Sequence, residues 1–221
     1  MYEKYQVQWL KDTTKLKGKW GGEVWKDVES IEVKHFMGDE PEHKPKTEAK
    51  VLYDEQFIYV IFRVEDRFIR AVAQNYQDSV CQDSCVEFFF TPGADFSLGY
   101  FNIEINCGGT MLFNYQTASE VNVVAVSVSD CDKVKIYHSE PKIVEPEKQQ
   151  PTTWVIEYRV PFDVLEKYCP ITRPAPAVSW RANFYKCADS TSNPHWLTWS
   201  VVDYPVPNFH LPQYFGTLEF K

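Results

Sequence analysis

Short runs of aromatic and β-branched residues, separated by turn residues, recur along almost the whole chain. The clearest pair, 50–53 and 56–64, flanks Asp54-Glu55 and predicts a hairpin. Further strands are expected at 69–73, 83–90, 100–106, 110–115, 121–128, 133–138, 153–160, 179–185 and 216–220. Because such runs favour strands and repeat at regular spacing, the sequence predicts an all-β fold: one antiparallel β-sandwich domain over residues 1–221.

Helix signals are sparse. Only 161–168, with Pro161 at its start, predicts a helix of about two turns. The polar, proline-containing stretches 38–48 and 140–151 predict long surface loops, and the strands on both sides of each argue against a domain linker.

The charge and hydropathy patterns exclude several kinds of partner. The net charge is −8, and no basic stripe interrupts it, which argues against a nucleic-acid partner. No apolar run is long enough to span a membrane. No signal peptide is visible at the start, so an extracytoplasmic location would require a precursor segment that has been removed, and the compartment stays open.

The stretch 82–90, QDSCVEFFF, places two carboxylates in one predicted strand. Strand alternation puts Ser84, Val86, Phe88 and Phe90 on the core face, and Asp83, Cys85, Glu87 and Phe89 on the other. Asp83 and Glu87 would be about 13 Å apart along the backbone. Glycosidase carboxylates stand only about 5–9.5 Å apart, so Glu87 with Glu104 from another strand is the better catalytic candidate. Glu87 is otherwise expected in a buried polar network with Arg or Asn neighbours.

Two further runs place polar side chains on one face of a strand. Asn102, Glu104 and Asn106 share one face, and Arg181, Asn183 and Tyr185 share another. Such a face is either the wet side of an antiparallel sheet or a surface that binds a polar ligand.

Aromatic residues cluster late in the chain, among several prolines. Trp196 and Trp199 lie three apart, so in an extended segment they face opposite ways. One would then be core and the other a flat apolar platform suited to a sugar ring; the alternative is that both are core.

The sequence offers weak metal signals. The six cysteines are irregularly spaced, which favours free buried thiols over a disulfide scaffold. Cys81 and Cys85 lack a second Cys or His pair, so zinc has little support. Calcium is better supported, by oxygen ligands near strand ends: Asp66, Asp78, Asp83 and Glu87. The nucleophile and phosphate-binding motifs of common enzymes are not found in the sequence.

Several short motifs, in order, carry a resemblance to a known family. They are Gly18-Lys19-Trp20 with Trp25, Ala49–Asp54, Ile58–Asp66, Asp83–Phe89, Tyr100–Asn106 with Gly108, Asn183–Lys186, and Phe209–Pro212 with Phe215-Gly216. Together they resemble the family 9 carbohydrate-binding modules over nearly the whole chain. The resemblance implies a β-sandwich that binds sugars without catalysis, and that accompanies polysaccharide-degrading glycoside hydrolases.

The resemblance also implies a site. Members of the family hold a terminal sugar between two tryptophans, place charged and amide side chains on its hydroxyls, and carry structural calcium. Trp196 or Trp199 corresponds to one tryptophan; the segment 75–82, where the other is expected, has only Tyr76 as a replacement.

The resulting hypothesis is non-catalytic carbohydrate binding. Tyr76 and Trp196 or Trp199 would stack on the sugar, and the candidate hydrogen-bonding groups are Arg70, Asp83, Asn102, Arg181, Asn183 and Lys186. In a regular strand, Lys186 projects to the opposite side from Arg181 and Asn183, so the three side chains are not expected to reach one site together. The alternatives are a glycoside hydrolase or other carbohydrate-active enzyme on the same sandwich, and an interaction domain whose sugar site has decayed.

Overall fold

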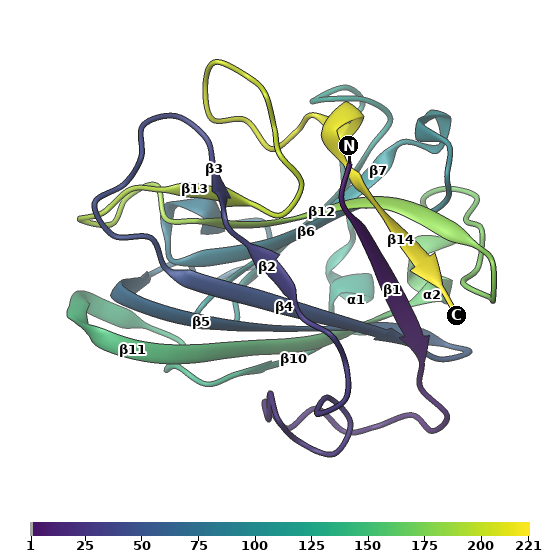
Figure 1. Cartoon of the computed structure of the whole chain (residues 1–221), viewed down its shortest axis with the longest axis horizontal. Coiled ribbons are helices and arrows are strands. Elements are labelled where there is room, and N and C mark those ends of the chain that lie inside the picture. Colours follow the sequence, from purple (N-terminus) through teal and green to yellow (C-terminus); the bar gives the residue numbers. More distant parts are fainter. Residues whose placement is uncertain (1) are drawn as a thin grey trace.

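The computed structural model describes residues 2–221, which form a curled sheet of fourteen strands folded into two facing layers (Figure 1). The first layer contains, in spatial order, β10 (Lys135–His138), β11 (Val144–Pro161), β5 (Phe57–Ala71) and β4 (Lys46–Tyr53). The second contains β14 (Gly216–Phe220), β12 (Ser179–Cys187), β6 (Cys85–Thr91), β7 (Tyr100–Asn106), β8 (Met111–Gln116) and β9 (Val124–Ala125).

Short elements complete the fold. Strand β2 (Ile31–Val33) pairs with β4, while β13 (Trp196–Thr198) pairs with both β12 and β3 (His35–Phe36). The helices are α1 (Val128–Cys131) and α2 (Phe162–Leu165), and the 3-10 turns are η1 (Val80–Gln82), η2 (Phe96–Leu98) and η3 (Pro212–Tyr214). In the described part of the chain, no helix has the length and apolar character needed to cross a membrane.

The N-terminal strand β1 (Lys4–Trp9) joins the two layers. Its residues 4–7 pair in parallel with β14, and residues 8–9 pair in parallel with β4. In Figure 1, β1 descends beside β14 and reaches the lower layer. The predicted all-β sandwich is therefore confirmed, with the difference that β1 makes its sheet mixed rather than purely antiparallel.

The core between the layers is built from alternate residues of each strand. Phe88 on β6 and Phe184 on β12 stack with ring centroids 4.7 Å apart, and Phe62 on β5 meets Phe184 from the other layer at 6.0 Å. Val86, Phe88 and Phe90 belong to this core, as the alternation of 82–90 predicted. The alternate residues of β6, which include Glu87 and Phe89, therefore face away from the first layer.

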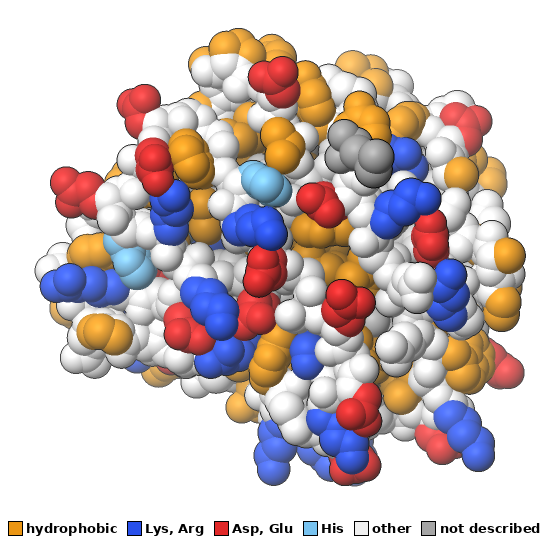
Figure 2. All heavy atoms as spheres, viewed as in Figure 1, with side chains coloured by type: hydrophobic (Ala, Val, Ile, Leu, Met, Phe, Trp, Pro, Cys, Tyr) orange, Lys and Arg blue, Asp and Glu red, His pale blue; other side chains and the backbone are white. Residues whose placement is uncertain are grey.

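A second apolar cluster covers part of that outer face. Phe89 and Tyr185 point outward from β6 and β12, and the C-terminal loop lies against them with Phe209 stacked on Tyr185 at 4.1 Å between ring centroids. The same loop carries exposed Val201, Tyr204 and Val206. Figure 2 shows apolar side chains gathered over this loop at the top of the molecule, above a surface where acidic and basic groups are interspersed.

The local predictions have mixed outcomes. The hairpin at 50–64 is confirmed: Tyr53 pairs with Ile58, and Asp54 Oδ1 accepts hydrogen bonds from the backbone N–H groups of Gln56 and Phe57. The loop predicted at 140–151 is wrong from Val144 onward, because β11 begins there and pairs with β5 through two register shifts. The strand predicted at 121–128 is reduced to β9, and the helix predicted at 161–168 is reduced to α2.

The contact between the layers gives a first prediction. Replacing Phe184 by Ala should lower the free energy of unfolding by about 3–5 kcal/mol, because it opens a cavity between Phe88 and Phe62. The matched control, Phe36→Ala at an exposed position on β3, should cost well under half of that. Urea denaturation of both variants measures the difference, and equal losses would show that Phe184 does not hold the layers together.

Candidate carbohydrate-binding site

A hollow of about 580 Å³ lies on the outer face of the second layer, where the C-terminal loop leaves the sheet uncovered. Its floor is polar and consists of side chains from β6, β7 and β8, namely Glu87, Asn102, Glu104, Asn114 and Gln116, with Leu112 beside them. Its walls are loops: Trp196 and Asp189 stand on one side, residues 204 and 206–210 on another, and Glu120 with Val123 on a third.

Strand register assembles this floor. Glu87 on β6 lies opposite Glu104 on β7, which lies opposite Leu112 on β8. Two residue pairs along the same strands, Asn102 lies opposite Asn114. Directly opposed residues project on the same side of a sheet. The polar residues of each strand therefore lie on the same face as the polar residues of its neighbours. The isoleucines of β7 point the other way, into the core.

A chain of hydrogen bonds orients the buried amides of the floor. Tyr100 Oη donates to Gln116 Oε1 (3.0 Å), Gln116 Nε2 donates to Asn102 Oδ1 (2.9 Å), and Asn102 Nδ2 donates to Glu104 Oε1 (2.9 Å). His210 Nδ1 lies 2.9 Å from Tyr100 Oη, so the C-terminal loop is tied to the same chain. We call these five residues the amide relay. Polar networks of this kind fix their members in one orientation when every member is satisfied.

The two carboxylates of the floor lie in an unusual environment. Burial raises the pKa of Glu104 to about 7, with a further contribution from the Asp189 carboxylate. Burial and the facing Glu104 raise the pKa of Glu87 well above its usual range. The sequence predicted Arg or Asn neighbours for Glu87, whereas its hydrogen-bond partner within residues 2–221 is the Cys187 thiol, 3.0 Å away.

Trp196 forms the aromatic wall of the hollow. Its ring is half-buried, and its Nε1–H donates to Asp189 Oδ1 (2.8 Å), which fixes the ring orientation. Its backbone carbonyl accepts from the N–H of Met37, and β13 holds the residue against β12. The ring is thus a fixed apolar plane beside a polar floor.

A buried ionic network lies behind Trp196. Lys186 Nζ is 2.7 Å from His195 Nε2 and 3.5 Å from Asp66 Oδ2 on β5, and all three side chains are buried. His43 Nε2 approaches Asp66 Oδ1 at 3.1 Å from the other side. Since the ammonium group donates to Nε2, His195 is neutral and donates from Nδ1 to the carbonyl of Asn193 (2.7 Å). Burial and the Lys186 ammonium group lower the pKa of His195 to about 3.

The sequence-predicted site residues separate into two groups. Trp196 and Asn102 line the hollow. Tyr76 borders a different hollow of about 770 Å³, where its hydroxyl donates to Asp132 Oδ1 (3.1 Å). Trp199 is buried with its ring edge-on to Phe184, and Arg70 is ion-paired with Glu145.

The remaining four predicted residues have partners inside the protein. Asp83 is fully buried; its Oδ2 accepts from the backbone N–H groups of Val72 and Ala73 and from Asn106 Nδ2. Asn183 bonds to the backbone of Ser200, and Lys186 belongs to the ionic network. Arg181 donates to the carbonyl of Phe215.

Sequence reasoning missed several residues of the hollow. Asn114 and Gln116 continue the alternation of the strand predicted at 110–115, so their parity with Leu112 was a usable signal. His210 and Asp189 come from loops, and no periodicity in the sequence indicates where a loop residue will lie.

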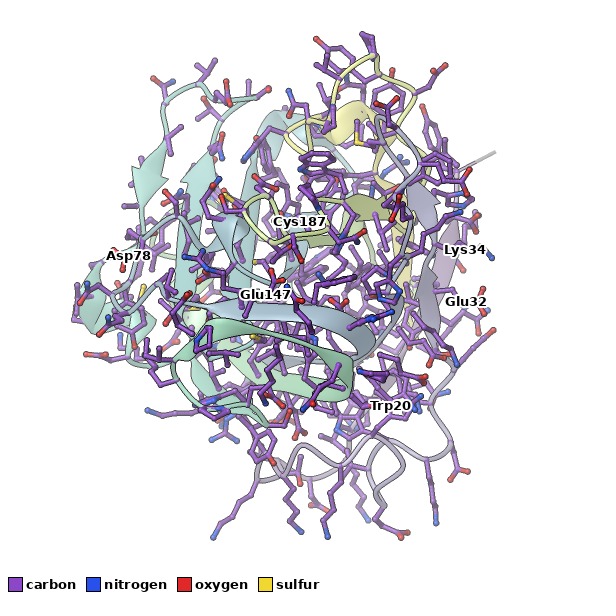
Figure 3. All side chains as sticks on the ribbon, turned by 90° about the vertical axis from the view of Figure 1, so that its left-hand side faces the viewer. Trp20, Glu32, Lys34, Asp78, Glu147 and Cys187 are labelled. Carbon is purple, nitrogen blue, oxygen red and sulfur yellow. The ribbon has the colours of Figure 1, made fainter. Side chains whose placement is uncertain are left out.

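The four acidic residues predicted to bind calcium do not form one set of ligands. Asp66, Asp78 and Asp83 accept hydrogen bonds from nearby backbone N–H groups, and Glu87 faces a thiol. Asp78 also lies far from the floor: Figure 3 shows it at one edge of the molecule and Cys187, the neighbour of Glu87, in the interior. These residues do not converge on one point, so they do not fit a shared calcium ion.

Comparisons with known proteins show the family and the fold of the chain. The sequence profile of Carbohydrate-binding family 9 matches residues 24–220. A candidate carbohydrate-binding protein from Bacteroides uniformis is similar over 100% of both chains, with 25% identity and a TM-score of 0.87. A family 9 carbohydrate-binding module from Caldicellulosiruptor kristjanssonii, solved with cellotriose, covers 99% of this chain and 94% of its own, with 12% identity and a TM-score of 0.68. The same module with glucose has a TM-score of 0.67 at 12% identity, over 99% of this chain and 96% of its own. No match was found among curated proteins.

The fold and the family match together identify a carbohydrate-binding β-sandwich. The chain belongs to carbohydrate-binding family 9.

The ionic network gives a pH prediction. Buried Glu87 and Glu104, whose pKa values are raised in the fold, add stability as the pH falls, so the effect of His195 must be separated from theirs. The unfolded chain protonates His195 near pH 6.5 but the folded chain only near pH 3, so the contribution of His195 to stability falls as the pH falls through this window. Between about pH 6.5 and 5 this amounts to about 2 kcal/mol, at 1.36 kcal/mol per unit. The stability of His195→Gln relative to the wild type should therefore rise by that amount between pH 6.5 and 5, whereas the relative stability of His138→Gln, outside the network, should stay constant. Urea denaturation of the wild type and both variants at the two pH values measures this, and a His195→Gln variant with the pH dependence of the wild type would contradict the assignment.

Proposed function

We propose that residues 1–221 form one non-catalytic binding domain that holds a terminal sugar, or the end of an oligosaccharide, in the hollow over β6, β7 and β8. The position of Trp196 carries the proposal. A sugar ring has an apolar face of C–H groups and a rim of hydroxyls, so it needs a flat apolar surface beside fixed polar groups. Trp196 supplies the first, and the floor of the hollow supplies the second.

The floor suits hydroxyl groups in particular. Hydroxyls both donate and accept, and the floor offers amide N–H donors, amide oxygens and carboxylates within one patch. The amide relay holds Asn102 and Gln116 in place before any ligand arrives, which lowers the entropic cost of binding. Neutral sugars carry no charge, so the net charge of −8 does not oppose their approach.

The structural neighbours point to a substrate class. The Caldicellulosiruptor module of the same family was solved with glucose and with cellotriose. We infer that β-linked glucose units are the first ligands to test here. The partly exposed position of Trp196 also favours an intact site over an interaction domain whose sugar site has decayed.

The alternative function is that of a glycoside hydrolase, with Glu87 and Glu104 as its two carboxyl groups. These residues are candidates because they lie directly opposite each other on neighbouring strands. A hydrolase needs its two carboxyl groups on either side of the glycosidic bond. These two project in the same direction from neighbouring strands and are 2% and 5% exposed, so both would lie beneath a sugar rather than around a bond. We therefore favour binding without hydrolysis.

Replacing Trp196 by Ala should weaken glucose and cellotriose binding at least about tenfold, because the ring provides a flat apolar surface beside the polar floor. Isothermal titration calorimetry of the wild type and the variant measures the change. Trp9→Ala is the matched control: Trp9 is exposed on β1, outside the hollow, and its loss should leave the affinity unchanged.

A second variant distinguishes the two hollows. Tyr76→Ala should bind sugar as the wild type does, because Tyr76 lies in the other hollow. A loss of affinity in Tyr76→Ala with none in Trp196→Ala would move the sugar site there. Release of reducing sugar from cellotriose, lost in Glu104→Gln, would replace the binding proposal by the hydrolase.

A further inference from the structure

One cluster of side chains at the end of the hollow is not explained by sugar recognition. Cys85 on β6 lies directly opposite Cys187 on β12, and Glu87 follows Cys85 on the same side of β6. The two Sγ atoms and a carboxylate oxygen of Glu87 lie within 4.8 Å of one another. Within residues 2–221, this is the one place where three His, Cys, Asp or Glu side chains converge in this way.

The spacing of these atoms suits a small metal ion. Zinc binds thiolate sulfur at about 2.3 Å and carboxylate oxygen at about 2.0–2.2 Å, so its ligands lie nearly 4 Å from one another. Cys187 Sγ is already 3.0 Å from Glu87 Oε1, and both strands are held rigidly in register. The set therefore needs only small side-chain movements to surround an ion.

The chemistry of the donors selects the kind of metal. Two sulfurs and one carboxylate match zinc, which accepts Cys and Asp or Glu together. Calcium and magnesium require oxygen ligands and are excluded by the two sulfurs. All three side chains are buried, with exposed fractions of 0%, 1% and 2%.

The charge of the surroundings also favours a cation. The carboxylates of Glu104 and Asp189 border the same end of the hollow, together with the thiol of Cys81. The nearby amine of Lys186 lies on the opposite side of β12, where it contacts His195 and Asp66. The anionic forms of these buried groups are costly, and a bound divalent ion stabilises them.

We propose that Cys85, Cys187 and Glu87 form a zinc site whose fourth coordination position faces the hollow. Cys187 and Glu87 both line the hollow, so a water molecule can reach that position. An open fourth position of this kind is what allows a zinc ion to take an exogenous oxygen ligand. Metal binding requires both thiols as thiolates and Glu87 as a carboxylate, and the protons that these groups lose are released to solvent.

The site was not evident from the sequence. Cys85 and Cys81 are close in the chain but lack a second pair, whereas the partner that completes the set, Cys187, is 102 residues from Cys85. Only the pairing of β6 with β12 brings the two sulfurs together.

Cobalt titration of the metal-free, reduced protein tests the proposal. Co²⁺ bound by thiolates gives an intense sulfur-to-metal charge-transfer absorption, and we expect this band to saturate at one ion per chain and to disappear when Zn²⁺ is added. Cys85→Ala, Cys187→Ala and the isosteric Glu87→Gln should each weaken Zn²⁺ binding roughly 100-fold or more, as expected when one ligand of a tight site is lost. Cys131→Ala removes a buried thiol outside the cluster and should change nothing.

Three results would overturn the proposal. They are a titration without the charge-transfer band, a band that survives in both Cys187→Ala and Glu87→Gln, and a Cys85–Cys187 disulfide, found as a cross-linked peptide in a digest of the freshly purified protein. Glu87→Gln retains the shape of the side chain, so it gives an answer even where a Cys variant fails to fold. None of these measurements uses a sugar, so the zinc site and the sugar site can fail independently.

Discussion

The register among β12, β6, β7 and β8 is the constraint on which the rest of the structure depends. In these strands, apolar residues alternate with polar residues. The pairing places the apolar residues of all four strands on one face of the sheet and the polar residues on the other. A slip of one residue in β6 would turn Glu87 into the core and Phe88 out of it. The stacking of Phe88 on Phe184 therefore fixes which side chains form the floor of the hollow as well as holding the layers together.

A polar floor this deeply buried needs internal partners. The amide relay satisfies Asn102 and Gln116, and it links them to His210 on the covering loop. Glu87 and Glu104 have fewer partners, and their pKa values rise as a consequence of burial. The two ends of the hollow therefore differ in the partners that their buried polar groups have. We propose that the end near Gln116 binds neutral hydroxyls and that the end near Cys187 binds a cation.

Strand alternation made much of the fold predictable from the sequence. It located β4, β6, β7 and β12, and it placed Asn102 and Glu104 correctly on one side of their strand. It divided β5 wrongly into two strands at 56–64 and 69–73, because the charged residues 65–67 resemble a strand end. It failed at 144–151, where polar residues and two register shifts concealed the start of β11. Polar composition predicted a loop there, yet an outward-facing strand can be equally polar, because only one of its faces meets the core.

The site was less predictable than the fold. Trp196 and Asn102 were named from the sequence and lie in the hollow, whereas Tyr76 lies in another hollow and Asp83 is enclosed by backbone N–H groups. A charged residue in a strand gives no local signal of whether it will meet a ligand or a backbone donor. That distinction depends on neighbours distant in sequence, as the meeting of Cys85 with Cys187 also shows.

The central claim is that the hollow beside Trp196 is where sugar binds. The chain contains seven tryptophans, and each indole N–H gives its own NMR resonance in ¹⁵N-labelled protein. Titration with cellotriose should shift the resonance of Trp196 most and leave those of Trp9 and Trp20 in place. A saturable shift at Trp9 or Trp20 with none at Trp196 would contradict the account.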